Sequence, residues 1–244
     1  VGLKTILNPG EEVIILSHYF VEYGYYIDNH GGAAAVVPTG ADFQPDLAAI
    51  AAAITPKTRA VIINSPNNPS GVVYPEARLR DLGDLLRQKE EENGSEIFII
   101  SDEPYRRIIY DGLTYPQVFP HYQNTIVVHS HAKDLALPGE RIGYIAVHPS
   151  YPHREELVNG FTFCNRTLGF VNAPALMQHA VRALQGVSVG VADYQRKRDY
   201  LYGQLIEMGY SVVKPQGAFY LFPRSPIEDD VAFVDALQQW NVLT

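Results

Sequence analysis

Short apolar runs alternate with amphipathic segments through roughly the first 150 residues of the chain. Several runs are continuously apolar, as expected of strands that are covered on both faces. Between them, helical periodicity predicts helices over 1–7, 46–54 and 76–92. This alternation predicts an α/β fold, a mainly parallel sheet flanked by helices, with ligand sites at the carboxyl ends of strands. The predicted strands are 12–17, 33–38, 60–64, 97–101, 125–130 and 141–148.

Beyond about residue 150 the pattern changes to longer helical stretches. A helix is predicted over 175–185 and another over 189–208, and then two strands flank a Pro-Gln-Gly turn before a last helix. We therefore expect a large domain over 1–185 and part of a smaller α+β domain over 186–244. The two strands and the last helix are predicted over 210–214, 218–222 and 229–240.

Composition narrows the class of protein. With 46% hydrophobic residues the chain is globular, and its 19 basic and 27 acidic residues argue against a nucleic-acid or anionic-membrane binder. The single cysteine, Cys164, excludes an intrachain disulfide and a four-cysteine zinc site, so no metal is expected. It also fits a reducing compartment, and we expect a cytoplasmic location. No apolar run is long enough to span a bilayer.

Lys133 follows an apolar strand, with Ser130 three residues before it and Arg141 eight after it. A lone lysine there is usually a solvated charge, and Arg141 alone would suit a surface pair with Glu140. Together, however, an amine that condenses with an aldehyde and two groups that hold a phosphate suit an anionic aldehyde cofactor.

Two other strand ends carry polar groups that suit the same ligand. Asn68 lies in a proline-rich turn after the strand 60–64, and Asp102 and Tyr105 follow the strand 97–101. An aspartate there would keep a pyridine nitrogen protonated, and the tyrosine would reach the phenolic oxygen of the ring. An ordinary turn, a helix cap and core packing explain each residue singly. The convergence of all three strand ends favours one site.

Five segments closely resemble the signature blocks of fold-type I pyridoxal-phosphate aminotransferases, the aspartate aminotransferase-like class I/II group. The resemblance covers essentially the whole chain, and the block around Lys133 is the most specific. The segments are NPSG at 68–71, SDEPY at 101–105, SHAKDLALPGERIGY at 130–144, LNPGEEV at 7–13 and PQGAFYL at 215–221.

The resemblance implies a role for each candidate residue. Lys133 would form the Schiff base with pyridoxal 5'-phosphate and shuttle the proton between the substrate α-carbon and the cofactor. Asp102 would pair with the ring nitrogen, while Tyr105 and Asn68 would hydrogen-bond the ring oxygen; Asn68 would also contact the substrate.

The remaining candidates would bind other parts of the cofactor and the substrate. The resemblance places Ser130 and Arg141 on the phosphate and Phe20 against the ring. Arg166 lies near the position where some relatives reach across a homodimer to the substrate side chain; a surface arginine is the alternative.

The resemblance also implies segments outside the chain. The loop that wraps the phosphate would precede Val1, and the arginine that grips the substrate carboxylate would follow Thr244. We therefore expect an internal piece of a longer protein that binds the cofactor weakly alone. A homodimer is expected from the family.

The leading functional hypothesis is transfer of an amino group between an L-amino acid, such as aspartate, glutamate or an aromatic one, and a 2-oxo acid. The first alternative is a carbon-sulfur lyase or another elimination enzyme with the same cofactor contacts. A second, of a different class, is a cofactor-sensing domain of a transcription regulator, which the acidic balance does not favour.

Overall fold

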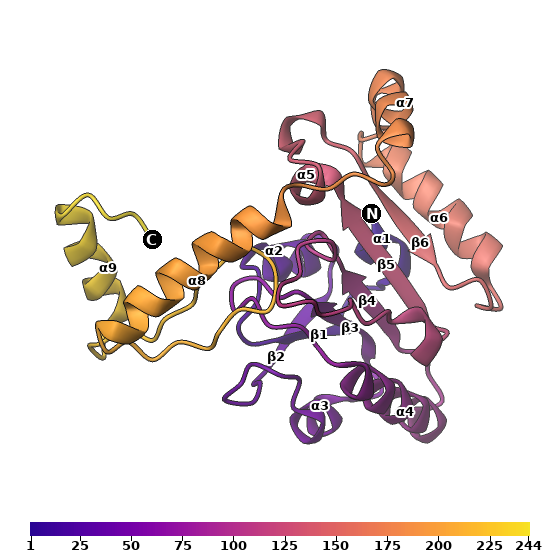
Figure 1. The fold of residues 1–244 in the computed structure, drawn as a ribbon. Helices are drawn as coiled ribbons and strands as arrows, with labels where there is room; N and C mark the ends of the chain where they lie inside the picture. The colour runs from indigo at the N-terminus through magenta and orange to yellow at the C-terminus, as the bar shows by residue number, and fades with distance from the viewer.

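The computed structural model describes all 244 residues, and its centre is one six-stranded sheet (Figure 1). The strands are β1 (Glu12–Leu16), β2 (Ala33–Val37), β3 (Thr58–Asn64), β4 (Phe98–Asp102), β5 (Thr125–Ser130) and β6 (Gly143–Val147). Their order is β2-β1-β3-β4-β5-β6, and every neighbouring pair is parallel except β5 and β6. The mainly parallel α/β sheet predicted from the apolar runs is confirmed.

Helices cover both faces of the sheet. The α-helices are α1 (Gly2–Ile6), α2 (Glu22–Asp28), α3 (Leu47–Ala53), α4 (Glu76–Asn93), α5 (His131–Asp134), α6 (Arg154–Thr167), α7 (Ala175–Ala183), α8 (Val191–Glu207) and α9 (Asp230–Gln239), with 3-10 turns η1 (Phe119–His121) and η2 (Pro138–Glu140).

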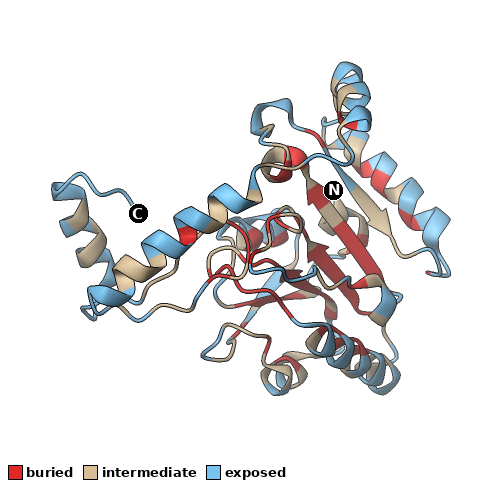
Figure 2. Ribbon diagram, viewed as in Figure 1, coloured by how far each residue is buried: buried red, intermediate tan, exposed pale blue.

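Alternate residues of each strand enter two separate cores, because successive side chains of a strand point to opposite faces. Ile14 of β1 packs with α3 and α4, whereas its neighbours Val13 and Ile15 pack with α1, α2 and α6. The sheet is therefore buried on both sides, and Figure 2 shows its central strands among the most buried parts of the molecule. This explains why the strand sequences are continuously apolar.

Residues after α7 form a less buried part to one side of the sheet, where α8 and α9 lie (Figure 1, Figure 2). The prediction of regular strands over 210–214 and 218–222 is wrong, because only an isolated bridge joins Val212 to Pro223. The turn between them instead donates to the large sheet's loops: the backbone N–H groups of Gln216 and Gly217 both bond to the carbonyl of Gly71. The proposed boundary after residue 185 stays a prediction.

None of the helices combines the length and the apolar character that crossing a bilayer requires.

Gly143 lets β6 approach the end of β5 closely, since it pairs with Ser130 and a Cβ there would overlap the carbonyl oxygen of His129. Gly143→Ala should lower the free energy of unfolding by about 1–3 kcal/mol, as overpacking does. The control is Gly139→Ala in the same connection, where a Cβ has no neighbour within 4 Å. Urea unfolding checks this; equal stability of the two variants would contradict it.

Candidate active site

The carboxyl ends of β3, β4 and β5 lie side by side and carry the candidate residues. Register pairs Asn64 at the end of β3 with Asp102 at the end of β4. β5 ends at Ser130, and α5 starts at the next residue because the Ser130 hydroxyl caps it, accepting from the N–H of Ala132 at 3.2 Å. Lys133 lies in this single helical turn and is partly buried.

Asp102 accepts hydrogen bonds at both its carboxylate and its backbone carbonyl. The Tyr23 hydroxyl on α2 donates to its carboxylate at 2.5 Å, and the Asn64 side chain donates to its backbone carbonyl at 2.9 Å. Burial raises the pKa of Asp102 to about 6, although the Tyr23 hydrogen bond acts to lower it. Without a cation beside it, the Asp102 carboxyl group therefore has a pKa of about 6. A cationic group beside it would keep it ionised.

Asn68 and Tyr105 meet through a third side chain, Tyr220. The Asn68 amide lies 3.4 Å from the Tyr220 hydroxyl, and the hydroxyls of Tyr105 and Tyr220 are 2.6 Å apart. Asn68 is itself fixed, because its backbone N–H donates to the Asn64 side chain at 2.6 Å. The cluster presents hydroxyl and amide donors that suit an oxygen of a bound ring. Tyr105 is also 3% exposed, so core packing contributes to its position.

Phe219 connects this cluster to the lysine. The Lys133 amine lies 5.6 Å from the centre of the Phe219 ring, and the Phe219 and Tyr105 rings pack edge to face at 5.4 Å. A cation near a ring face is attracted by the ring's electrons. Lys133 and Tyr105 therefore both lie beside the same aromatic side chain, that of Phe219.

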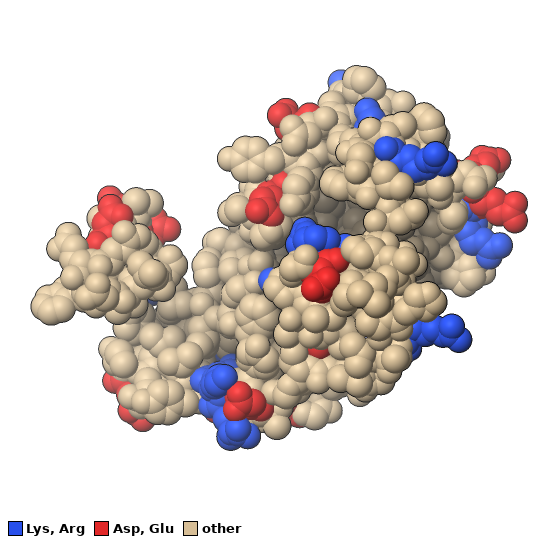
Figure 3. Space-filling view, turned by 90° about the horizontal axis from the view of Figure 1, so that it is seen from above, with Lys and Arg blue, Asp and Glu red and all other residues tan.

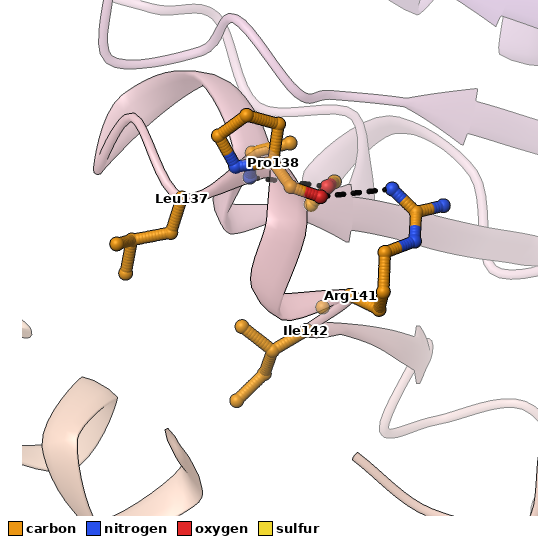
Figure 4. Close-up of a pocket in the computed structure, with 7 residues that line it drawn as sticks. Leu137, Pro138, Arg141 and Ile142 are labelled. Atoms are coloured by element: carbon orange, nitrogen blue, oxygen red, sulfur yellow. Dashed lines mark hydrogen bonds between the residues drawn. The ribbon is translucent and has the colours of Figure 1, made fainter. Parts of the chain in front are cut away.

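Ser130 and Arg141 line one pocket of about 240 Å³ with Leu137, Pro138 and Ile142 (Figure 4). The guanidinium of Arg141 is exposed and donates to the carbonyl of Pro138 at 3.0 Å. Arg141 has φ 50°, a left-handed conformation that is uncommon for a residue with a side chain. A hydroxyl and a planar guanidinium at one pocket suit an anion such as phosphate. Figure 3 shows a hollow in one face of the molecule, with basic side chains at its rim and an acidic one next to them.

The two remaining candidates differ in position. Phe20 is partly buried and packs edge to face on Tyr23 at 5.7 Å, which places it beside the residue that bonds Asp102. Arg166 lies exposed in the last turn of α6 and forms no hydrogen bond or ion pair with another candidate. Its assignment to the substrate stays a prediction.

Sequence reasoning missed two residues, Tyr23 and Tyr220. Tyr23 is the second residue of α2, and its bond to Asp102 spans 79 positions and has no local signal. Tyr220 belongs to the segment PQGAFYL, but its contact with Asn68 spans 152 positions and has no local signal.

Asp102→Asn should stabilise the cofactor-free protein. The folded-state pKa of about 6 exceeds the unfolded value of 3.8, so the ionised carboxylate opposes folding. This destabilisation is absent below about pH 4 and reaches its full size above about pH 6. At pH 8 the variant should gain about 2–3 kcal/mol, and at pH 4 almost nothing. Urea unfolding at both pH values measures this, with the exposed Asp28→Asn as control; a gain that does not depend on pH would refute the explanation.

Tyr23→Phe should raise the pKa of Asp102 further, because the lost hydrogen bond favours the ionised form. A hydrogen bond to a charged group corresponds to an increase of about one to two units. Carboxyl ¹³C shifts followed against pH would show it. Tyr26→Phe, which loses only an exposed bond to Glu22, should leave Asp102 unchanged; an unmoved titration in Tyr23→Phe would contradict the assignment.

Comparison with known proteins identifies the family of the chain. Residues 2–244 match the profile of the family "Aminotransferase class I and II". The chain is 33% identical over 237 residues to the "Probable aspartate/prephenate aminotransferase" of Thermus aquaticus, an alignment that covers 94% of this chain and 60% of that protein. It is 34% identical over 233 residues to "Aromatic-amino-acid aminotransferase 2" of Thermococcus litoralis, covering 91% of this chain and 57% of that protein.

A solved structure agrees as well. A crystal structure of an amino transferase from Eubacterium rectale superposes with a TM-score of 0.95 at 41% identity, over 99% of this chain and 61% of that one. The chain thus spans about three fifths of the length of these proteins. Members of the matched family depend on pyridoxal phosphate. This chain belongs to the class I and II aminotransferases, of fold type I.

Proposed function

We propose that the whole protein transfers an amino group between an L-amino acid and a 2-oxo acid with pyridoxal 5'-phosphate as cofactor. The observation that carries the proposal is that Asp102 ends β4 while Ser130 and Lys133 lie at the same end of the adjacent β5, where Ser130 shares a pocket with Arg141. The family membership and the names of the relatives support it.

The side chains at these strand ends fit the cofactor's chemical groups. Ser130 and Arg141 would hold the phosphate, Asp102 the ring nitrogen, and Tyr105 with Asn68 the ring oxygen. Phe20 would pack on the ring. When bound, pyridoxal phosphate supplies an electron-accepting ring that stabilises negative charge on the substrate α-carbon.

Two residues then control protons. Asp102 would keep the ring nitrogen protonated, and the positive charge of that nitrogen would lower the pKa of Asp102 from about 6, so that the carboxylate would stay ionised at neutral pH. The Tyr23 hydrogen bond acts in the same direction. Lys133, as a free amine, would accept the proton that leaves the substrate α-carbon.

We infer that the substrates are acidic or aromatic amino acids. Two relatives that cover more than 90% of the chain are named for aspartate/prephenate and for aromatic amino acids. No observation favours the carbon-sulfur lyase or the regulator, so neither is proposed. The cytoplasmic location expected from the lone cysteine stays a prediction.

We also infer a homodimer. Large apolar side chains are exposed on the surface formed by α6, α7 and their connection: Phe163 is 68%, Phe170 67% and Leu176 78% exposed. Val21 and Tyr25, at the start of α2 next to the site, are each 70% exposed. Apolar groups gathered in this way are typical of protein–protein interfaces.

Lys133→Ala tests the proposed function in the whole gene product. We expect wild type to absorb as a cofactor–lysine adduct that borohydride fixes on Lys133, and the variant to lose transamination by at least about a thousandfold. The exposed Lys57→Ala is the control. Each of the amino acids is supplied with and without a 2-oxo acid, because a lyase would release ammonia and pyruvate with no acceptor. Undiminished turnover in Lys133→Ala would refute the proposal.

A further inference from the structure

Three buried ionisable side chains lie close to Lys133 in the sequence but are not among the candidate active-site residues. His129 and His131 are each 5% exposed, and Asp134 is fully buried. The Asp134 carboxylate lies 3.1 Å from Nε2 of His129 and 3.2 Å from Nδ1 of His131. The cluster thus brackets the lysine turn from the end of β5 to the end of α5.

The contacts of His129 determine how many hydrogens its ring carries. Its Nδ1 lies 2.8 Å from the backbone carbonyl oxygen of Glu103, which only accepts, so Nδ1 carries a hydrogen. Its Nε2 faces the Asp134 carboxylate, which also accepts when ionised. A neutral imidazole would point a lone pair at one of these two oxygens. Hydrogens on both ring nitrogens would give each of these oxygens a donor.

The surroundings of Asp134 keep it ionised. Burial acts to raise its pKa, but the hydrogen bonds and charges of His129 and His131 outweigh burial and leave the pKa below its usual range. The guanidinium Nε of Arg107 lies 3.8 Å from the same carboxylate. An ionised carboxylate with these partners is the acceptor that a doubly protonated His129 needs.

Asp134 also joins the lysine turn to the chain that leads into α8. Its backbone carbonyl accepts from the N–H of Val189 at 2.8 Å. Arg107 donates to the carbonyls of Gln185 at 2.7 Å and Val187 at 2.8 Å. Asp134 therefore connects α5 to residues 185–189 in two ways: its backbone carbonyl bonds Val189, and its carboxylate lies beside Arg107, which bonds Gln185 and Val187.

Other ionisable groups face the cluster from the neighbouring elements. The Glu103 carboxylate, 3% exposed, bonds Ser101 and lies 3.8 Å from Arg106. The Tyr144 ring of β6 packs on His129 at 5.1 Å. The carboxylate that contacts His129 is therefore that of Asp134, and the Glu103 carboxylate bonds Ser101 and lies beside Arg106 instead.

We propose that His129 is an imidazolium whose buried ion pair with Asp134 positions the turn that carries Lys133 and fastens it to residues 185–189. His129 and Asp134 are then positioning residues of the reaction, which rests on the proposed function. The same three side chains have the residue types of a metal site. Their spacing is that of hydrogen bonds, and Arg107 beside the carboxylate opposes a second cation, so a proton is the better occupant.

Histidine NMR tests the protonation without any use of activity. In the whole gene product labelled with ¹⁵N-histidine, the resonances that disappear in His129→Gln belong to His129. At pH 7.5 we expect both of its ring nitrogens to show an attached hydrogen and imidazolium shifts. One bare nitrogen, or stoichiometric zinc by elemental analysis, would overturn the inference, whether or not the protein is an aminotransferase.

Two substitutions of His129 test positioning. Asn places its amide near Nδ1 and keeps the bond to Glu103 but loses Asp134, whereas Gln reaches the place of Nε2 and keeps Asp134. With cofactor, His129→Asn should lower kcat/KM by about 10–100-fold, because displacements near 1 Å have such effects. Borohydride trapping on Lys133 should slow in parallel, and His129→Gln should recover part of both.

The control is His153→Asn, an exposed histidine at the start of α6 that should behave as wild type. Wild-type kcat/KM and trapping in a folded His129→Asn would overturn the positioning role. If His129→Asn does not fold, the comparison of His129→Gln with wild type decides the role. A borohydride-trapping rate in His129→Gln that is more than tenfold below that of wild type would show that the contact with Asp134 is not what positions Lys133. An inactive wild type with a doubly protonated His129 would refute only the proposed function.

Discussion

The enclosed carboxylate of Asp102 is the constraint on which the candidate site depends. A charge at the end of a buried strand loses its hydration, and the protein offsets that loss only in part, through the Tyr23 hydroxyl. Burial therefore favours the neutral form of Asp102 over the ionised form. The ionised carboxylate lowers the stability of the cofactor-free protein and favours the binding of a cation, as is typical of functional sites.

The sheet explains why Asp102 has the right neighbours. Parallel strands bring their carboxyl ends to one edge, so residues 64, 102 and 130 lie at the same edge of the sheet although they are far apart in sequence. Both faces of the strands are occupied by separate cores, which leaves that edge as the place where polar groups collect. The Gly71 carbonyl then receives the turn at 216–217, and this brings Tyr220 against Asn68 and Tyr105.

The strands could be predicted within a few residues because burial on both faces leaves continuous apolar runs that no helix of that length would show. The groups at their ends were predictable for the same reason. Tyr23 and Tyr220 were not, because their partners depend on how α2 and the 215–221 turn pack. The strands expected at 210–214 and 218–222 do not form a ladder, because the N–H groups of Gln216 and Gly217 bond Gly71 and that of Ala218 bonds Ile108 instead.

The turn that holds Lys133 is a helix of only four residues, His131–Asp134. A helix this short does not form by itself in water, since nucleation costs more than one turn of hydrogen bonds returns. Its geometry is therefore supplied by the Ser130 cap, the close passage of Gly143 and the buried carboxylate at its end. For that reason, the segment around Lys133 would not keep its geometry in another protein: transplanted alone, it would supply the amine but not the amine's orientation.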